Sequence, residues 1–241
     1  GKPLEDASMF YGHKEEGRAI RDSIIRETGG KLSMVPGSAV IVHGQKKSGK
    51  TSLVNQVKNF INDDPALSKQ AIMINFANIL TETGGKENLS GFQHAFYADI
   101  MIRFEDEVHK HHKDVFQLLD EAHIEIPDLL DPEYNEIWPA KFDQFFSDFA
   151  RIDGGRHTLV IFMDEFTLFC SAIFEAVRED PTNKAMTTLP GFIKTFSQRG
   201  FVQVIIGHES MMRAFDSLGV LNHTAEFATA VEVGQPDHDS A

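Results

Sequence analysis

GQKKSGKTS, Gly44 to Ser52, is the most informative segment of the sequence. It matches the pattern G-x-x-x-x-G-K-[ST], in which glycines let the backbone curl so that its N–H groups and the following helix N-terminus face a phosphate. Lys50 adds a positive charge, and the Thr51 hydroxyl is an expected Mg²⁺ ligand. The residues that we expect to line the nucleotide site are Gly44, Gln45, Lys46, Lys47, Ser48, Gly49, Lys50, Thr51 and Ser52.

The residues on either side of this loop predict a strand before it and a helix after it. SAVIVH, residues 38–43, is apolar and β-branched, as in a buried parallel strand. After the loop, apolar residues recur at helical spacing. A strand–loop–helix junction is the context in which the pattern binds phosphate, and the alternative is a lysine-rich surface turn before an ordinary helix. The apolar positions are Leu53, Val54, Val57, Phe60 and Ile61.

A second motif follows in HTLVIFMDEFTLF, residues 157–169. Residues 159–163 predict a buried strand whose carboxyl end carries Asp164 and Glu165, at the edge where open α/β sheets bind ligands. Asp164 is the expected metal ligand, and Glu165 is the expected base that polarises water for attack on the γ-phosphate. The alternative is a pair of solvated carboxylates opening a turn.

Three further apolar runs complete a predicted sheet. They are residues 71–76, 229–233 and the run FVQVIIGHES, residues 201–210. His208 is a candidate sensor of the γ-phosphate, with a helix-capping or structural histidine as the alternative. Five strands alternating with helices predict a three-layer α/β P-loop NTPase fold, with a mainly parallel sheet flanked by helices and a helical or loop insertion.

MFYGHKEEGRAI (residues 9–20), the phosphate loop, LVIFMDEF and VQVIIG together resemble the ATPase core of the signal-transduction ATPases with numerous domains (STAND) and the related origin-binding and helicase-loader branch of the AAA+ clan. The resemblance spans residues 9–234. It implies that Tyr11 and Gly12 help hold adenine, with His13 where the family carries arginine. It also implies that the Asp164 strand lies beside the loop strand, with the 202–207 strand between them or adjacent. Arg213 is the candidate arginine finger, with a surface residue as the alternative.

The resemblance also implies a domain organisation. Residues 1–35 form an N-terminal segment that packs on the core near the adenine site. Residues 36–234 form the ATPase core, with an insertion at about residues 113–140, and residues 235–241 begin a lid or tail that lies outside the chain. The chain then corresponds to the excised core of a larger multidomain protein, with protein partners or self-association through the missing domains.

Composition excludes several classes of protein. With 241 residues, 41% of them hydrophobic, the chain can bury a large core, and its net charge of −13 argues against a broad nucleic-acid-binding face. The apolar runs are too short to span a bilayer. Cys170, the single cysteine, cannot form an internal disulfide, which predicts a core thiol in a reducing cytoplasm.

Two other patterns resemble functional motifs but have plainer interpretations. LSGFQ, residues 89–93, is similar to the signature of ABC transporter ATPases, but it lies far ahead of Asp164 and carries Phe92 in place of a glycine. We interpret it as the start of a core helix. VHKHHKD, residues 108–114, predicts a solvated helix end rather than a metal site. The expected core stripes are Phe92, Phe96, Ile100, Phe104 and Val108, and Phe142, Phe145, Phe146 and Phe149.

These patterns favour a regulatory ATPase that binds ATP with Mg²⁺ and is reset by hydrolysis. A nucleotide-gated binding module that holds ATP or ADP with little hydrolysis is the first alternative. A small-molecule kinase is the second, although it needs several arginines and only Arg178 and Arg199 lie between Glu165 and Gly207. Adenine is favoured over guanine by the resemblance, and the guanine-reading N-K-x-D pattern is absent from the sequence.

Overall fold

The computed structural model describes residues 13–77, 89–179, 185–217 and 228–234. Its centre is a five-stranded sheet with the order β4-β5-β6-β3-β7, and every neighbouring pair is parallel. The expected α/β fold is therefore confirmed, and β6 lies between the loop strand β3 and the Asp164 strand β5. The strands are β3 (Ala39–His43), β4 (Ala71–Phe76), β5 (Thr158–Met163), β6 (Val202–Ile206) and β7 (Thr229–Glu232).

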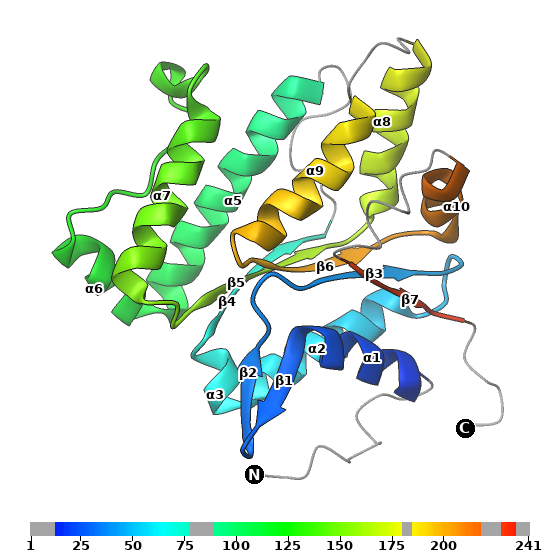
Figure 1. Cartoon of the computed structure of the whole chain (residues 1–241), viewed down its shortest axis with the longest axis horizontal. Helices are drawn as coiled ribbons and strands as arrows, with labels where there is room; N and C mark the ends of the chain where they lie inside the picture. Colours follow the sequence, from blue (N-terminus) through cyan, green and yellow to red (C-terminus); the bar gives the residue numbers. More distant parts are fainter. Residues whose placement is uncertain (1–12, 78–88, 180–184, 218–227, 235–241) are drawn as a thin grey trace.

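Helices cover both faces of this sheet and make three layers (Figure 1). The lower layer in that view holds α1 (Lys14–Ile24), α2 (Lys50–Asp63), α3 (Pro65–Ser68) and a small hairpin. The upper layer holds α5 (Leu89–His111), α7 (Trp138–Asp153), α8 (Phe166–Glu179) and α9 (Ala185–Gln198). The remaining elements are α6 (Lys113–Glu121), the 3-10 helix η2 (Pro132–Tyr134) and α10 (Glu209–Ser217).

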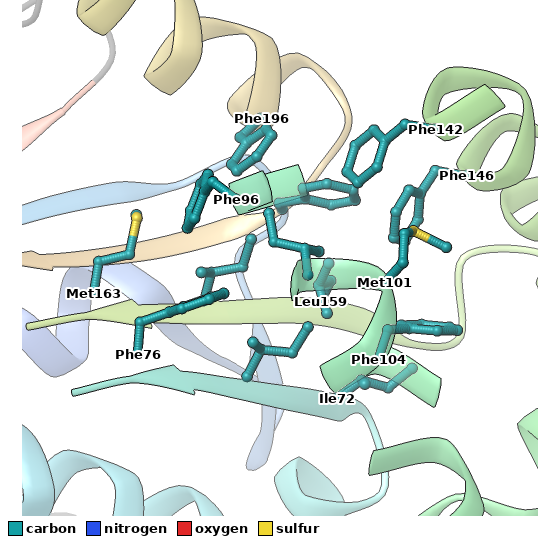
Figure 2. Close-up of a cluster of buried hydrophobic side chains, with 14 of the residues drawn as sticks. Ile72, Phe76, Phe96, Met101, Phe104, Phe142, Phe146, Leu159, Met163 and Phe196 are labelled. Atoms are coloured by element: carbon teal, nitrogen blue, oxygen red, sulfur yellow. The ribbon is translucent and has the colours of Figure 1, made fainter. Parts of the chain in front are cut away.

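The sheet separates two hydrophobic cores of different composition. The lower core is aliphatic apart from Phe162 among its buried residues, whereas the upper core is crowded with phenylalanine. Figure 2 shows Phe76, Phe96, Phe196 and Phe142 on one side of the sheet, and the centroids of successive rings in this order lie 5.0, 6.5 and 6.2 Å apart. Trp138 packs at the rim of this aromatic layer. Both predicted stripes are confirmed at their described positions, Phe96, Ile100, Phe104, Val108, Phe142, Phe145, Phe146 and Phe149, and Phe92 lies outside the described side chains.

Cys170 also lies in the upper core, with 1% of its surface exposed. Burial raises the pKa of its thiol well above the ordinary value, so the side chain stays protonated and unreactive. The predicted core thiol is confirmed.

The hairpin of β1 (Ile25–Thr28) and β2 (Lys31–Met34) is an element that the sequence patterns did not reveal. Gly29 and Gly30 connect its strands with φ values of 59° and 74°, the left-handed backbone that a two-residue hairpin turn requires. Ile25 and Met34 reach into the lower core from its base. The base of the hairpin is therefore part of the lower core, in contact with α1 and α3.

The predicted solvated helix end at residues 108–114 is wrong for one histidine. His111 is exposed, but His112, between α5 and α6, is only 5% exposed. The chain turns at His112, because its N–H still bonds the carbonyl of Val108 while its own carbonyl accepts bonds from Val115 and Phe116 at the start of α6. The turn directs this side chain inward.

Among the described residues, no helix is both long enough and apolar enough to cross a membrane.

Candidate nucleotide site

The phosphate loop connects the carboxyl end of β3 to the N-terminus of α2. Gly49 is the N-cap of α2 and has a φ of 89°, and Lys47 is also left-handed with a φ of 67°. This curl presents the N-terminal N–H groups of a 14-residue helix to the space above the loop. Gln45, Lys46 and Lys47 are exposed along the rim, whereas Ser48 is buried and Ser52 is exposed on the first turn of α2.

Gly44 is fixed by packing rather than by the turn alone. A Cβ added at Gly44 would lie 2.3 Å from the carbonyl oxygen of Val233, just beyond β7. The Val233 N–H in turn donates to the carbonyl of His43 at 2.7 Å. No side chain fits at this position, so a glycine at position 44 is what allows the loop to pack closely against the end of β7.

Lys50 lies across the loop. Its ammonium donates to the carbonyls of Gly44 at 3.0 Å and Gln45 at 2.6 Å. Burial lowers the pKa of Lys50, while the carboxylates of Glu165 and Asp164 nearby act to raise it. The positive charge is thus held over the loop and next to both acidic residues of the second motif.

The two motifs meet in a hydrogen bond between Thr51 and Asp164, 113 residues apart in sequence. The Thr51 hydroxyl donates to Oδ2 of Asp164 at 3.0 Å. Asp164 is in turn placed by its own N–H, which bonds the carbonyl of Phe76 at the end of β4 at 2.8 Å. A hydroxyl and a carboxylate side by side are the hard oxygen donors that suit Mg²⁺.

Glu165 follows Asp164 with an exposed side chain and a left-handed backbone, φ 53°. Its N–H donates to Oδ1 of Asp164 at 2.8 Å, and its carbonyl accepts from Leu168 at 3.0 Å in the first turn of α8. The strained conformation turns the chain sharply from β5 into α8. It leaves the Glu165 carboxylate at the carboxyl edge of the sheet, with access to solvent.

His208 caps a helix. Its Nδ1 accepts from the N–H of Ser210 at 3.1 Å, which satisfies one of the free N–H groups at the start of α10. The N–H of His208 donates to the hydroxyl of Thr167 in α8 at 2.5 Å, which joins the ends of β5 and β6. The helix-capping role expected as an alternative is therefore filled by Nδ1 of His208. A role for Nε2 in sensing the γ-phosphate stays a prediction.

Arg213 lies one turn into α10, with 76% of its side chain exposed and an ion pair to Glu209 at 2.6 Å. The helix starts beside the loop, because the N–H of Glu209 donates to the carbonyl of Gly44 at 3.2 Å. Within the described residues, this places an exposed arginine on the helix that borders the phosphate loop.

His13 contacts the loop, a contact that the sequence patterns did not predict. Tyr11 and Gly12 lie outside the described residues, but His13, the N-cap of α1, is 6% exposed. Its Nε2 would lie 3.3 Å from a Cβ on Gly49, so the ring packs on the glycine at the start of α2. Nδ1 lies 3.5 Å from Glu16, and Nε2 has no hydrogen-bond partner among the described residues.

A phosphate loop after β3, with β6 between β3 and the acidic strand β5, is the architecture of a P-loop NTPase. No protein-family model matches the chain, and no curated protein matches it. One similar solved structure is the ADP conformation of an ATP-binding cassette of an ABC transporter. It is 14% identical, the match covers 77% of this chain and 79% of that chain, and the TM-score is 0.27. These values assign no function to this chain.

Proposed function

We propose that this chain is the core of a regulatory ATPase that binds ATP with Mg²⁺ and hydrolyses it to reset a conformational switch. The observation that supports this most directly is the 3.0 Å bond from Thr51 to Asp164. It joins a loop with the pattern of a phosphate-binding loop to an acidic strand end, with the charge of Lys50 over the same loop. If Asp164 and Glu165 only opened a solvated turn, a hydrogen bond to a threonine at the N-terminus of α2, 113 residues away, would not be expected.

In this proposal the loop binds and orients the triphosphate. The N–H groups at the start of α2 and the ammonium of Lys50 stabilise the negative charge that moves between phosphates during transfer. Thr51 and Asp164 hold the magnesium ion, which when bound neutralises phosphate charge. Because Lys50 is partly buried, its charge is less screened by water than that of a surface lysine.

Glu165 is the base in the proposed reaction. Its carboxylate follows the metal ligand directly and is open to solvent, so it can accept a proton from a water molecule that attacks the γ-phosphate in line. The adenine would lie toward the N-terminal segment, where His13 already contacts Gly49. Arg213 would act on the nucleotide of a neighbouring subunit, which would make hydrolysis depend on self-association.

Nucleotide binding is tested by thermal unfolding of the chain with ATP, ADP or GTP in the presence of Mg²⁺. At one hundred times the dissociation constant, ATP should stabilise the protein by about 2.7 kcal/mol, and Lys50→Ala should remove this shift. Lys69→Ala, an exposed lysine beyond α3, is the matched control and should keep it. An equal shift with GTP would overturn the adenine assignment, and no shift with any nucleotide would overturn binding.

Hydrolysis is tested by replacing the base. Glu165→Gln should lower the release of phosphate by about 100-fold or more while the thermal shift with ATP is retained, because the amide cannot take a proton. Unchanged turnover would exclude Glu165 as the base. A thermal shift without turnover in the self-associated wild-type protein would instead support the nucleotide-gated binding module, and a phosphorylated acceptor in place of free phosphate would support a kinase.

A further inference from the structure

We propose that His112, Asp114 and His157 form a binding site for a divalent transition-metal ion, with zinc as the ion that the ligands suit best. His112 lies between α5 and α6, Asp114 lies in the first turn of α6, and His157 directly precedes β5. One potential ligand atom from each residue lies within 4.8 Å of the other two. Three ligands from two distant parts of the chain thus converge on one point.

The ring of His157 is already oriented as a metal ligand. Its Nδ1 bonds Oδ1 of Asp153 at 2.6 Å, and Asp153 is 2% exposed with its second oxygen accepting from the N–H of His157. A buried carboxylate on one ring nitrogen fixes the tautomer and directs Nε2 toward the site. That Nε2 lies 3.5 Å from Oδ2 of Asp114. Ligand atoms around a tetrahedral zinc ion are about 3.4 Å apart, so this pair already has suitable spacing.

The ring of His112 is buried beside the same end of the sheet. It lies close to the backbone of Ala71, the first residue of β4, and its Nε2 lies 3.8 Å from a carboxylate oxygen of Glu107. The two imidazole rings meet edge to face with their centroids 5.9 Å apart. The two rings therefore face each other, with His157 anchored by Asp153, and Glu107 is a neighbouring carboxylate that lies outside the group of three ligands.

Burial and ligand chemistry favour a metal ion over a network of ordinary ion pairs. His112 is 5% exposed, and the side chain of His157 is also only 5% exposed. Two imidazole nitrogens with one or two carboxylates are a common zinc ligand set. The exposed side chain of Asp114 lies on the open side of the site and provides an entry path.

The location indicates a structural role. Ala71 and Thr158 are paired at the amino ends of β4 and β5, so the site ties the α5–α6 turn to the end of the sheet opposite the phosphate loop. His157 and Asp164 lie at the two ends of β5, about 20 Å apart for a strand of this length. The metal would fasten the insertion to the sheet without touching the nucleotide.

The test is direct titration of the full chain, stripped with a chelator, with Zn²⁺ and with Co²⁺ as a spectroscopic probe, in the absence of nucleotide. We expect one equivalent of Co²⁺ to give the absorption bands of tetrahedral coordination and Zn²⁺ to displace it and raise the unfolding temperature. Asp114→Asn, a change at an exposed ligand, should weaken zinc binding at least tenfold. Asp153→Asn should weaken it about 10- to 100-fold although no ligand is lost.

Two controls separate this site from other metal-binding groups. His111→Gln changes the exposed neighbour of His112, and Asp164→Asn removes the expected magnesium ligand; both should leave zinc binding unchanged. Circular dichroism of each metal-free variant checks that it folds. If Asp153→Asn, a change at a buried residue, does not fold, the exposed Asp114→Asn variant decides the test. The proposal is overturned if no stoichiometric binding occurs, if Asp114→Asn binds zinc as tightly as wild type, or if Asp164→Asn abolishes binding.

Discussion

At the scale of single residues, the notable feature is backbone strain in both nucleotide motifs. Lys47 in the phosphate loop and Glu165 after β5 are non-glycine residues with positive φ, a conformation that costs about 1–2 kcal/mol for a residue with a Cβ. Neither site uses a glycine, which would remove that cost. A glycine at position 165 would make the same turn without strain, but it would supply no carboxylate at the edge of the sheet.

Glu165→Gly should therefore make the protein more stable and less active. We expect the free energy of unfolding to rise by about 1 kcal/mol, because glycine adopts this φ without strain, while ATP hydrolysis falls with the loss of the base. Glu165→Ala is the matched control, since it removes the same carboxylate but keeps the Cβ, and it should show no gain. Urea unfolding of both variants measures the difference; equal stabilities would show that this φ is not strained.

The residues of the candidate site were predictable from the sequence where a local pattern carries the chemistry. The loop and the acidic strand end each have a recognisable pattern, and both were placed at the same edge of the sheet. The His112–His157 pair was not predictable, because those residues are 45 positions apart and no sequence pattern joins the two segments that carry them. Only the fold shows that the turn after α5 points His112 toward the start of β5.

At the scale of elements, the contact between the loop and β7 explains why position 44 must be glycine. Gly44→Ala would drive a Cβ against the backbone carbonyl of Val233, which cannot rotate away as a side chain could. Gly154, at the end of α7, has a φ of 64° and open space around it, so Gly154→Ala measures the cost of a positive φ alone. We expect Gly44→Ala to cost about 2 kcal/mol more than Gly154→Ala in thermal unfolding, the usual scale of overpacking. A similar loss of stability for Gly44→Ala and Gly154→Ala would mean that the backbone at the end of β7 shifts to accommodate the added Cβ.

Elements with long, regular patterns were predicted better than short ones. All five sheet strands and the core-facing stripes of α5 and α7 follow from apolar runs and helical spacing. The β1–β2 hairpin did not, because each of its four-residue strands buries a single residue and carries no alternation of buried and exposed positions. The Gly29–Gly30 pair was the available signal, since two adjacent glycines between short strands favour a tight hairpin turn.

At the scale of the whole molecule, stability should depend on pH through a partly buried histidine. Burial lowers the pKa of His43 below its ordinary value of 6.5, and this outweighs the nearby carboxylates of Glu232 and Glu209, which raise the pKa. Between the lowered pKa and 6.5 the unfolded chain binds more protons than the folded chain, so folding loses stability as the pH falls through this range. Above 6.5 the contribution is fully present.

His43→Gln should flatten this dependence. We expect the free energy of unfolding of the wild type to fall between about pH 7 and about pH 5, and the variant to fall less steeply over the same range. The measurement is urea unfolding at each pH with a chelator present, so that metal binding at His112 does not contribute. His112, whose pKa is also lowered, remains in both proteins and accounts for part of the residual slope. Parallel curves would show that His43 titrates alike in the folded and unfolded chains.

The aromatic upper layer has an optical consequence. Trp138 is the single tryptophan of the chain, and it stacks on His94 with a centroid distance of 5.2 Å and an interplanar angle of 12°. Its fluorescence therefore arises on the face of the sheet opposite α2, among α5 and α7. If nucleotide binding moves only the loop and α2, this emission stays constant. A change in emission on adding ATP would be an intrinsic signal, free of any added dye, that the event at the phosphate loop has crossed the sheet.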